Sequence, residues 1–152
     1  MVHASRCNIA DLAPNSRPVD ALRSGARGVV DSHMRVLACG DRNWSDQALI
    51  DQSLDALHAQ HRIEVLIEGE ARGADTLARI WAESHEVPVM RCPAAWRSFG
   101  KAVGVIRNQM MLQEGLPNYC IAFHDDIEHS KGTKDMVRRC RSAGVPTEVV
   151  KH

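Results

Sequence analysis

The stretch EVLIEGEARGADTLARIWAESHEVPVMRC, residues 64–92, contains one complete strand–helix–strand unit. Residues 64–68 form a short apolar run that ends at Gly69, which is typical of a buried strand. The apolar residues of 74–85 recur at helical spacing, and a second apolar run follows over 87–92. Because the intervening helix returns the chain to the same end of the sheet, the two strands are predicted to pair in parallel.

The same alternation of short apolar runs and amphipathic stretches extends from residue 35 to residue 150. The pattern predicts strands over 35–39, 64–68, 87–92, 119–123 and 147–150. It predicts helices over 46–60, 74–85, 103–113 and 134–143. Strands that are separated by helices in this way predict an α/β fold, a three-layer sandwich with a mainly parallel sheet of about five strands.

Residues 1–33 do not share this pattern. They contain prolines and glycines but no sustained apolar period, so they bury too little apolar surface to be expected to fold alone. We therefore predict that residues 1–33 are a disordered leader or a misassigned start, and that residues 34–152 form the single folded domain.

The overall composition narrows the class of protein. The 152 residues contain 19 Lys and Arg against 19 Asp and Glu, so the formal net charge is zero, which argues against a nucleic-acid partner. No apolar run of about 18 residues is present, so no membrane partner is expected. Five cysteines without a CxxC pair, together with an N-terminus unlike a signal or transit peptide, predict reduced thiols and a cytoplasmic protein.

The loop after the first predicted strand contains Gly40, Arg42 and Trp44. In an open parallel sheet, ligands bind beyond the carboxyl ends of the strands. The glycine lets the backbone turn sharply beside a ligand, and the planar fork of Arg42 suits a phosphate or a carboxylate. Trp44 can stack on a base or pack on the edge of the sheet. The alternative is an ordinary turn with a surface arginine.

The loop after the second predicted strand contains Gly69, Glu70, Arg72 and Gly73, and Asp75 follows at the start of a helix. Two glycines around an arginine at a helix N-terminus predict unpaired backbone N–H groups that point toward one site, which favours an anion. Asp75 either caps the helix or binds a ribose hydroxyl, whereas Glu70 would repel a phosphate.

Two later segments add polar groups at the same edge. Arg107 and Asn108 lie near the start of the helix predicted at 103–113, and Trp96 precedes them in a loop. The segment before the helix at 134–143 contains Ser130, Lys131, Gly132 and Thr133. Its hydroxyls, ammonium group and backbone N–H groups would lie at a helix N-terminus, which is an anion-binding arrangement. In the simpler interpretation, Thr133 only caps the helix.

The loop at 124–129 contains two histidines and three acids, which can bind a divalent cation. Neighbouring residues on a loop have no fixed metal geometry, so we expect no metal and no cofactor. The spacing identifies no base that would activate a cysteine thiol, and no GxSxG motif is present, so nucleophilic catalysis is not predicted.

Four stretches in this order resemble the SLOG superfamily, in particular its YspA/YpsA-like branch. The stretches are RVLACGDRNW at 35–44, IEGEARGADTLARIWA at 67–82, AAWRSFGKAVGVIRNQMML at 94–112 and SKGTKDMVRRCRSAGVP at 130–146. The resemblance implies a Rossmann-like sheet whose loops hold a nucleotide or nucleotide-derived ligand. Many members of the branch look like ligand sensors or accessory proteins of phages and other mobile elements. Relatives often pair through helices, so the resemblance is compatible with a homo-oligomer.

The superfamily also includes DNA-binding DprA proteins and the LOG phosphoribohydrolases, which release a base from a nucleoside monophosphate. The LOG phosphate loop reads PGGxGTxxE. Here Gly132 and Thr133 match the GT, and Arg107 is similar to a LOG arginine at the start of a helix. Residues 124–126 replace the PGG, and Met136 stands where the glutamate would be. These are departures from the LOG pattern.

Two functions are therefore expected at the carboxyl edge of the sheet. The first is binding, or sensing, of a nucleotide-derived small molecule. The residues predicted to bind it are Gly40, Arg42, Trp44, Gly69, Arg72, Gly73, Asp75, Trp96, Arg107, Asn108, Ser130, Lys131, Gly132 and Thr133. The alternative is hydrolysis of an N-glycosidic bond, in which Arg107 holds the phosphate and one acid stabilises positive charge on the sugar. The candidate acids are Asp75, Asp125 and Asp135.

Overall fold

A computed structural model describes residues 4–6, 33–93 and 102–152. Its centre is a six-stranded sheet in the order β1-β4-β3-β2-β5-β6, and every pair of neighbouring strands is parallel. The strands are β1 (Ala4–Arg6), β2 (Met34–Gly40), β3 (Ile63–Glu68), β4 (Val89–Arg91), β5 (Tyr119–Phe123) and β6 (Thr147–Val150). The five strands expected from the sequence are all present.

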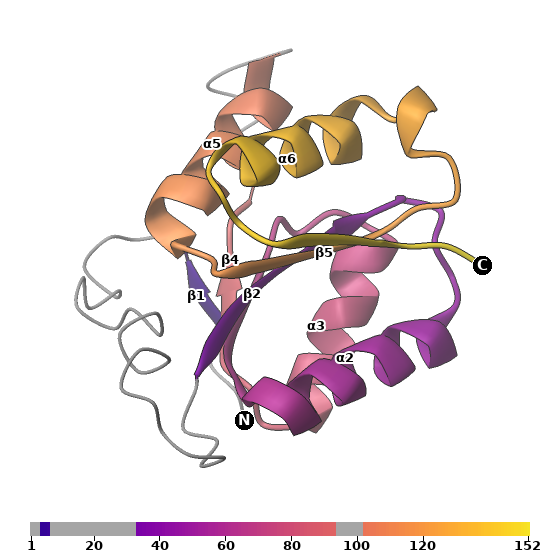
Figure 1. The fold of residues 1–152 in the computed structure, drawn as a ribbon, viewed down its shortest axis with the longest axis vertical. Helices are drawn as coiled ribbons and strands as arrows, with labels where there is room; N and C mark the ends of the chain where they lie inside the picture. The colour runs from indigo at the N-terminus through magenta and orange to yellow at the C-terminus, as the bar shows by residue number, and fades with distance from the viewer. Residues whose placement is uncertain (1–3, 7–32, 94–101) are drawn as a thin grey trace.

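Helices cover both faces of the sheet. They are α2 (Gln47–His61), α3 (Ala74–Ser84), α5 (Val103–Gly115) and α6 (Lys131–Ser142), and a short 3₁₀ turn, η3 (Ile127–His129), precedes α6. Figure 1 shows α2 and α3 on one face and α5 and α6 on the other. The expectation of a three-layer α/β sandwich, Rossmann-like in its parallel sheet and crossover helices, is confirmed.

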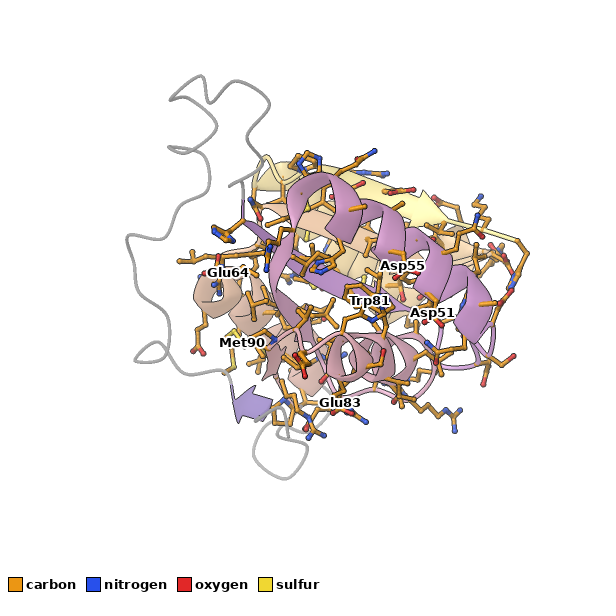
Figure 2. The ribbon with its side chains drawn as sticks, turned by 90° about the horizontal axis from the view of Figure 1, so that it is seen from below. Asp51, Asp55, Glu64, Trp81, Glu83 and Met90 are labelled. Atoms are coloured by element: carbon orange, nitrogen blue, oxygen red, sulfur yellow. The ribbon has the colours of Figure 1, made fainter. Side chains whose placement is uncertain are left out.

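The two faces of the sheet form two apolar cores. In β2, Val36 and Ala38 pack with the core under α2 and α3, whereas Leu37 and Cys39 pack with the core under α5 and α6. This alternation explains why residues 36–39 are all apolar, because a parallel sheet in an α/β fold is covered on both sides. On the first face, Trp81 of α3 donates a 2.8 Å hydrogen bond to Asp55 of α2 (Figure 2).

The start of α6 differs from the sequence-based expectation. The helix begins at Lys131 instead of Lys134, and Ser130 is its N-cap: the Ser130 hydroxyl accepts a 3.2 Å hydrogen bond from the backbone N–H of Thr133. The interpretation of Thr133 as the cap is therefore wrong, and this residue is buried in the first turn. A serine followed three residues later by a threonine offers two possible caps, and the local pattern does not choose between them.

Ser130→Ala is expected to lower the free energy of unfolding by about 1 kcal/mol, because the N–H of Thr133 loses its acceptor. Urea denaturation followed by circular dichroism measures the change. Ser130→Asn, which keeps a side-chain oxygen at the cap, is the matched control and should stay close to the wild type. Equal stability of the alanine variant and the wild type would contradict the assignment of the cap.

The N-terminal residues add one strand that the pattern does not predict. Ala4, Ser5 and Arg6 pair in parallel with Val89, Met90 and Arg91 of β4. Residues 1–3 and 7–32 lie outside the described residues, so the expectation of a disordered leader stays a prediction for them.

Two further expectations concern the cysteines and the membrane. Cys39, Cys120 and Cys140 are free and buried, but Cys92 is disulfide-bonded, so the expectation of reduced thiols throughout is wrong for Cys92. Within residues 33–93 and 102–152, no helix has the length and apolar character needed to cross a membrane.

Candidate functional site

A pocket of about 470 Å³, here named the main pocket, opens at the carboxyl edge of the sheet. The loops after β2, β3 and β5 meet there, because parallel strands end at the same edge. Most of the residues predicted from the sequence line it. They are Gly40, Arg42, Arg72, Asp75, Arg107, Asn108, Ser130, Lys131, Gly132 and Thr133. A volume of this size accommodates a small organic ligand.

Gly73 brings the start of α3 against the turn after β2. Its φ is +75°, and a Cβ at this position would lie 2.3 Å from the carbonyl oxygen of Asp41 and 2.5 Å from that of Arg42. The next N–H, that of Ala74, donates a 3.1 Å hydrogen bond to the Asp41 carbonyl. Glycine is required at this close approach, and its effect is to place Arg42 and Arg72 on the same wall of the main pocket.

Gly69 allows the side chain of Arg107 to cross the loop after β3. A Cβ on Gly69 would lie 2.9 Å from Cδ and 3.1 Å from Cζ of Arg107. Arg107 Nη1 donates a 2.9 Å hydrogen bond to the Gly69 carbonyl, whereas its buried Nε has no hydrogen-bond partner. The guanidinium is thus held by one backbone contact and keeps donors for a ligand.

Three backbone N–H groups of this loop are not available to an anion. Asp75 Oδ2 accepts from the N–H of Gly69 at 2.9 Å and from that of Ala71 at 3.3 Å, and Glu68 Oε2 accepts from the N–H of Glu70 at 2.7 Å. The expectation of unpaired N–H groups that point toward a ligand is therefore wrong for Gly69, Glu70 and Ala71. Two carboxylates of the protein already occupy this position.

Both of these carboxylates are buried and hold protons more tightly than usual. Burial raises the pKa of Glu68 to about 7, and the nearby negative charge of Asp75 adds to the shift. Burial likewise raises the pKa of Asp75 to about 6, against the opposing attraction of Arg107. Sequence reasoning missed Glu68, although a charged residue at the end of the apolar run 63–68 is the signal that could have found it.

Four cations at the main pocket make no direct ion pair with a described residue, although the Asp75 carboxylate attracts Arg107 and Arg42. In the part of the chain that the structure describes, no carboxylate oxygen lies within 4.0 Å of a nitrogen of Arg42, Arg72, Arg107 or Lys131. Five other cations, Arg79, Arg91, Lys134, Arg138 and Arg139, each have a carboxylate oxygen within 4.0 Å. The N-terminus of α6, with Lys131 and Gly132 in its first turn, adds a partial positive charge at the same pocket.

Asn108 joins α5 to the start of α6. Its buried side-chain amide donates to the Gly132 carbonyl at 3.2 Å and to Asp135 Oδ2 at 3.0 Å. Asp135 also accepts from Arg138 and Arg139, at 2.7 Å and 2.8 Å. Asp135 therefore fixes the helices and is absent from the main-pocket lining.

The remaining predicted residues lie elsewhere. Trp44 is 5% exposed, packs near Phe123 and stacks on His152 with ring centroids 4.3 Å apart, so it belongs to the core and not to the pocket lining. Asp125 is exposed and accepts two 2.8 Å hydrogen bonds from His152, one from its backbone N–H and one from its ring. Trp96 lies outside the described residues.

Comparisons with known proteins agree with this architecture. The family model of the YspA, cpYpsA-related SLOG family matches residues 34–99, which include β2, β3 and the two loops that carry Arg42 and Arg72. The Gene 61 protein of Mycobacterium phage D29 is 36% identical over 118 residues, which cover 74% of this chain and 92% of the phage protein.

A solved structure, that of DNA processing protein A (DprA) from Streptococcus pneumoniae, shares the fold. The TM-score is 0.60 at 16% identity, and the match covers 75% of this chain but only about half, 49%, of DprA. The likeness to DprA concerns the fold alone. On the family model and the phage relative together, the chain belongs to the YspA, cpYpsA-related SLOG family.

Proposed function

We propose that the main pocket binds a nucleotide or nucleotide-derived ligand through its phosphate. The observation that carries the proposal is the set of four cations, Arg42, Arg72, Arg107 and Lys131, which line one pocket and have no carboxylate oxygen within 4.0 Å among the described residues. Cations that converge on a concave site repel one another, and an anionic ligand relieves this repulsion. Their guanidinium groups match the geometry of phosphate oxygens.

The α6 N-terminus supports a phosphate over other anions. The first N–H groups of a helix have no partner within the helix, and here only that of Thr133 is taken, by Ser130. Lys131 and Gly132, the first two residues of the helix, line the pocket. A phosphate offers enough oxygens to accept from these N–H groups and from the arginines together. Convergence of the four cations on one pocket favours a small molecule over a nucleic acid.

Hydrolysis of an N-glycosidic bond is the second candidate, and it depends on one acid. Of the three acids expected to stabilise the sugar, Asp75 alone lines the main pocket, and its pKa of about 6 suits proton transfer near neutral pH. Asp75 also accepts two loop N–H groups, which favours a positioning role. Chromatography of AMP incubated with the protein separates the functions, because release of adenine occurs only in the second.

Arg72→Ala is expected to weaken the binding of ADP by tenfold or more, because one charge-assisted hydrogen bond contributes about 1.5–3 kcal/mol. Isothermal titration calorimetry at fixed salt measures the dissociation constant. Arg141→Ala removes the same charge from an exposed position of α6 outside the main pocket and is the matched control, expected to stay within twofold of wild type.

Two results would count against the proposal. The first is the absence of binding by the wild type to AMP, ADP and ADP-ribose at millimolar concentrations. The second is an equal loss of affinity in the Arg72 and Arg141 variants, because that would assign the effect to overall charge and not to the pocket.

A further inference from the structure

The two helical layers carry opposite charges, although the chain as a whole is neutral. Helix α6 contains five lysines and arginines and one acid. On the other side of the sheet, α2 contains Asp51 and Asp55 and neither lysine nor arginine (Figure 1). On α3, Glu83 is exposed, and the single cation, Arg79, already lies 3.8 Å from Glu68 and 3.9 Å from Glu83. The molecule therefore has a basic face over α6 and an acidic face over α2 and α3.

The basic face is hollowed. A cavity of about 740 Å³, here named the hollow, lies between the start of α5, η3 and α6. Val105, Ile127 and Val137 give it an apolar lining, and Val105 is 49% exposed. The charged side chains that line it are four cations and two acids: Lys131, Lys134, Arg138 and Arg141 against Glu128 and Asp135. An apolar surface with an excess of cations around it suits an apolar side chain that has acids beside it.

The acidic face presents such an apolar side chain. Ile80 of α3 is 46% exposed, and Glu83 follows one turn later on the same side of the helix. Asp51 of α2 lies beside α3, because the Gln47 side-chain amide donates both to Asp51 Oδ1, at 2.8 Å, and to the Leu77 carbonyl, at 3.0 Å. Figure 2 shows Asp51 and Glu83 on the side that α2 and α3 cover. An exposed isoleucine with acids beside it is the counterpart of the hollow.

We propose that copies of this chain associate head to tail, with the acidic face of one copy on the basic face of the next and Ile80 in the hollow. Asp51 and Glu83 then meet Lys134 and Arg141 of the neighbouring copy. Opposite charges attract across this contact, whereas two basic faces or two acidic faces repel. Because the two faces lie on opposite sides of the sheet, each copy keeps one face free, and further copies add to an open row.

The contact is separate from the proposed nucleotide site. Lys134 and Arg141 are absent from the lining of the main pocket, as are Asp51, Ile80 and Glu83. The association therefore goes beyond the proposed function, and it stands or falls independently of nucleotide binding.

Sedimentation equilibrium of the full chain at pH 8 and low salt tests the contact. The wild type is expected to exceed the 16.8 kDa of one copy and to keep growing as its concentration rises. At about 1 M salt it should return to the monomer, because the screening length falls to about 3 Å.

Charge reversal on either face should raise the dissociation constant tenfold or more. The basic-face variant combines Lys134→Glu with Arg141→Glu, and the acidic-face variant combines Asp51→Lys with Glu83→Lys. Lys151→Glu is the control, since it reverses a charge at the exposed end of the chain, outside the hollow and the acidic face, and should associate as the wild type does.

Mixing the two reversed variants distinguishes a head-to-tail contact from a contact between like faces. Each variant keeps one intact face, so an equimolar mixture should form a dimer with one copy of each and nothing larger. Its dissociation constant should lie within about threefold of the wild-type value, because the two faces that meet are unchanged. A mixture that stays monomeric overturns the proposal, as does a wild type that is monomeric at millimolar concentration.

Circular dichroism and urea denaturation establish that each variant is folded. If a reversed variant is unfolded, neutral replacements take its place: Lys134→Gln with Arg141→Gln, or Asp51→Asn with Glu83→Gln. These are expected to weaken self-association by at least threefold. Wild-type self-association of a folded variant of either face contradicts the head-to-tail contact.

Discussion

Gly73→Ala is expected to lower the free energy of unfolding by about 3 kcal/mol or more. A residue with a Cβ at φ +75° is strained by about 1–3 kcal/mol. In addition, the new Cβ would lie 2.3 Å from the Asp41 carbonyl oxygen, and this neighbour is backbone that cannot rotate away. The turn after β2 must then move away from α3, which separates Arg42 from Arg72 and should weaken ADP binding together with stability.

The measurement is urea denaturation, with calorimetric titration of ADP under conditions in which the variant is folded. Gly104→Ala in α5 is the matched control, because nothing lies within 4 Å of the Cβ that it adds. That variant is expected to equal the wild type or to gain up to about 1 kcal/mol, since alanine favours a helix interior over glycine. If Gly73→Ala were as stable as the wild type, the close approach of α3 to the turn after β2 would not be required for stability.

The layers of the fold could be predicted because they follow from the period of the apolar residues alone. Residues 36–39 of β2 are all apolar, and that is what a sheet covered on both faces needs. Strand β1 could not be predicted in the same way. It has three residues, too few to show a period, and it is recognisable by its pairing with β4.

Part of the site could be predicted, because the loops that follow parallel strands all lie at the carboxyl edge of the sheet. That rule correctly gathers Arg42, Arg72, Arg107 and Lys131 at one pocket. It does not say which way a side chain turns. Trp44 follows the same strand as Arg42, but it packs inward against His152, which is more than a hundred residues away in the chain.

The loop after β3 shows a second limit of sequence reasoning. Glycines at a helix start predict free N–H groups only if nothing in the protein accepts from them. Here Glu68 and Asp75 turn inward and accept from three successive N–H groups. A motif read along the chain does not reveal this competition, because it depends on the direction of two buried side chains.

Glu68→Gln is expected to stabilise the protein at pH 8 by up to about 3 kcal/mol and to change little at pH 5. Burial raises the pKa of Glu68 from 4.5 to about 7, so the folded state binds this proton more tightly than the unfolded state does. The corresponding stability is fully present below about pH 4.5 and is lost as the pH rises through about 7. Each pKa unit corresponds to about 1.4 kcal/mol.

Glutamine is neutral at every pH and keeps an oxygen that can accept from the N–H of Glu70, so the variant avoids the loss at high pH. Asp75, with its raised pKa, titrates in the same direction and remains in the variant, which should therefore retain part of the pH dependence. Urea denaturation at pH 5 and pH 8 measures both effects. The variant also loses the attraction of Glu68 to Arg79 and Arg91, whose nitrogens lie 3.8 Å and 3.7 Å from its carboxylate. This loss opposes the gain in stability at pH 8.

Glu83→Gln is the matched control, because Glu83 contacts the same Arg79 but its side chain is 51% exposed on α3 (Figure 2). Its replacement is expected to change stability by less than about 0.5 kcal/mol at either pH. If Glu68→Gln instead destabilises the protein at pH 8, the attraction of the two arginines outweighs the cost of burying the charge. Glu68 would then be an ionised anchor of the loop that carries Arg72.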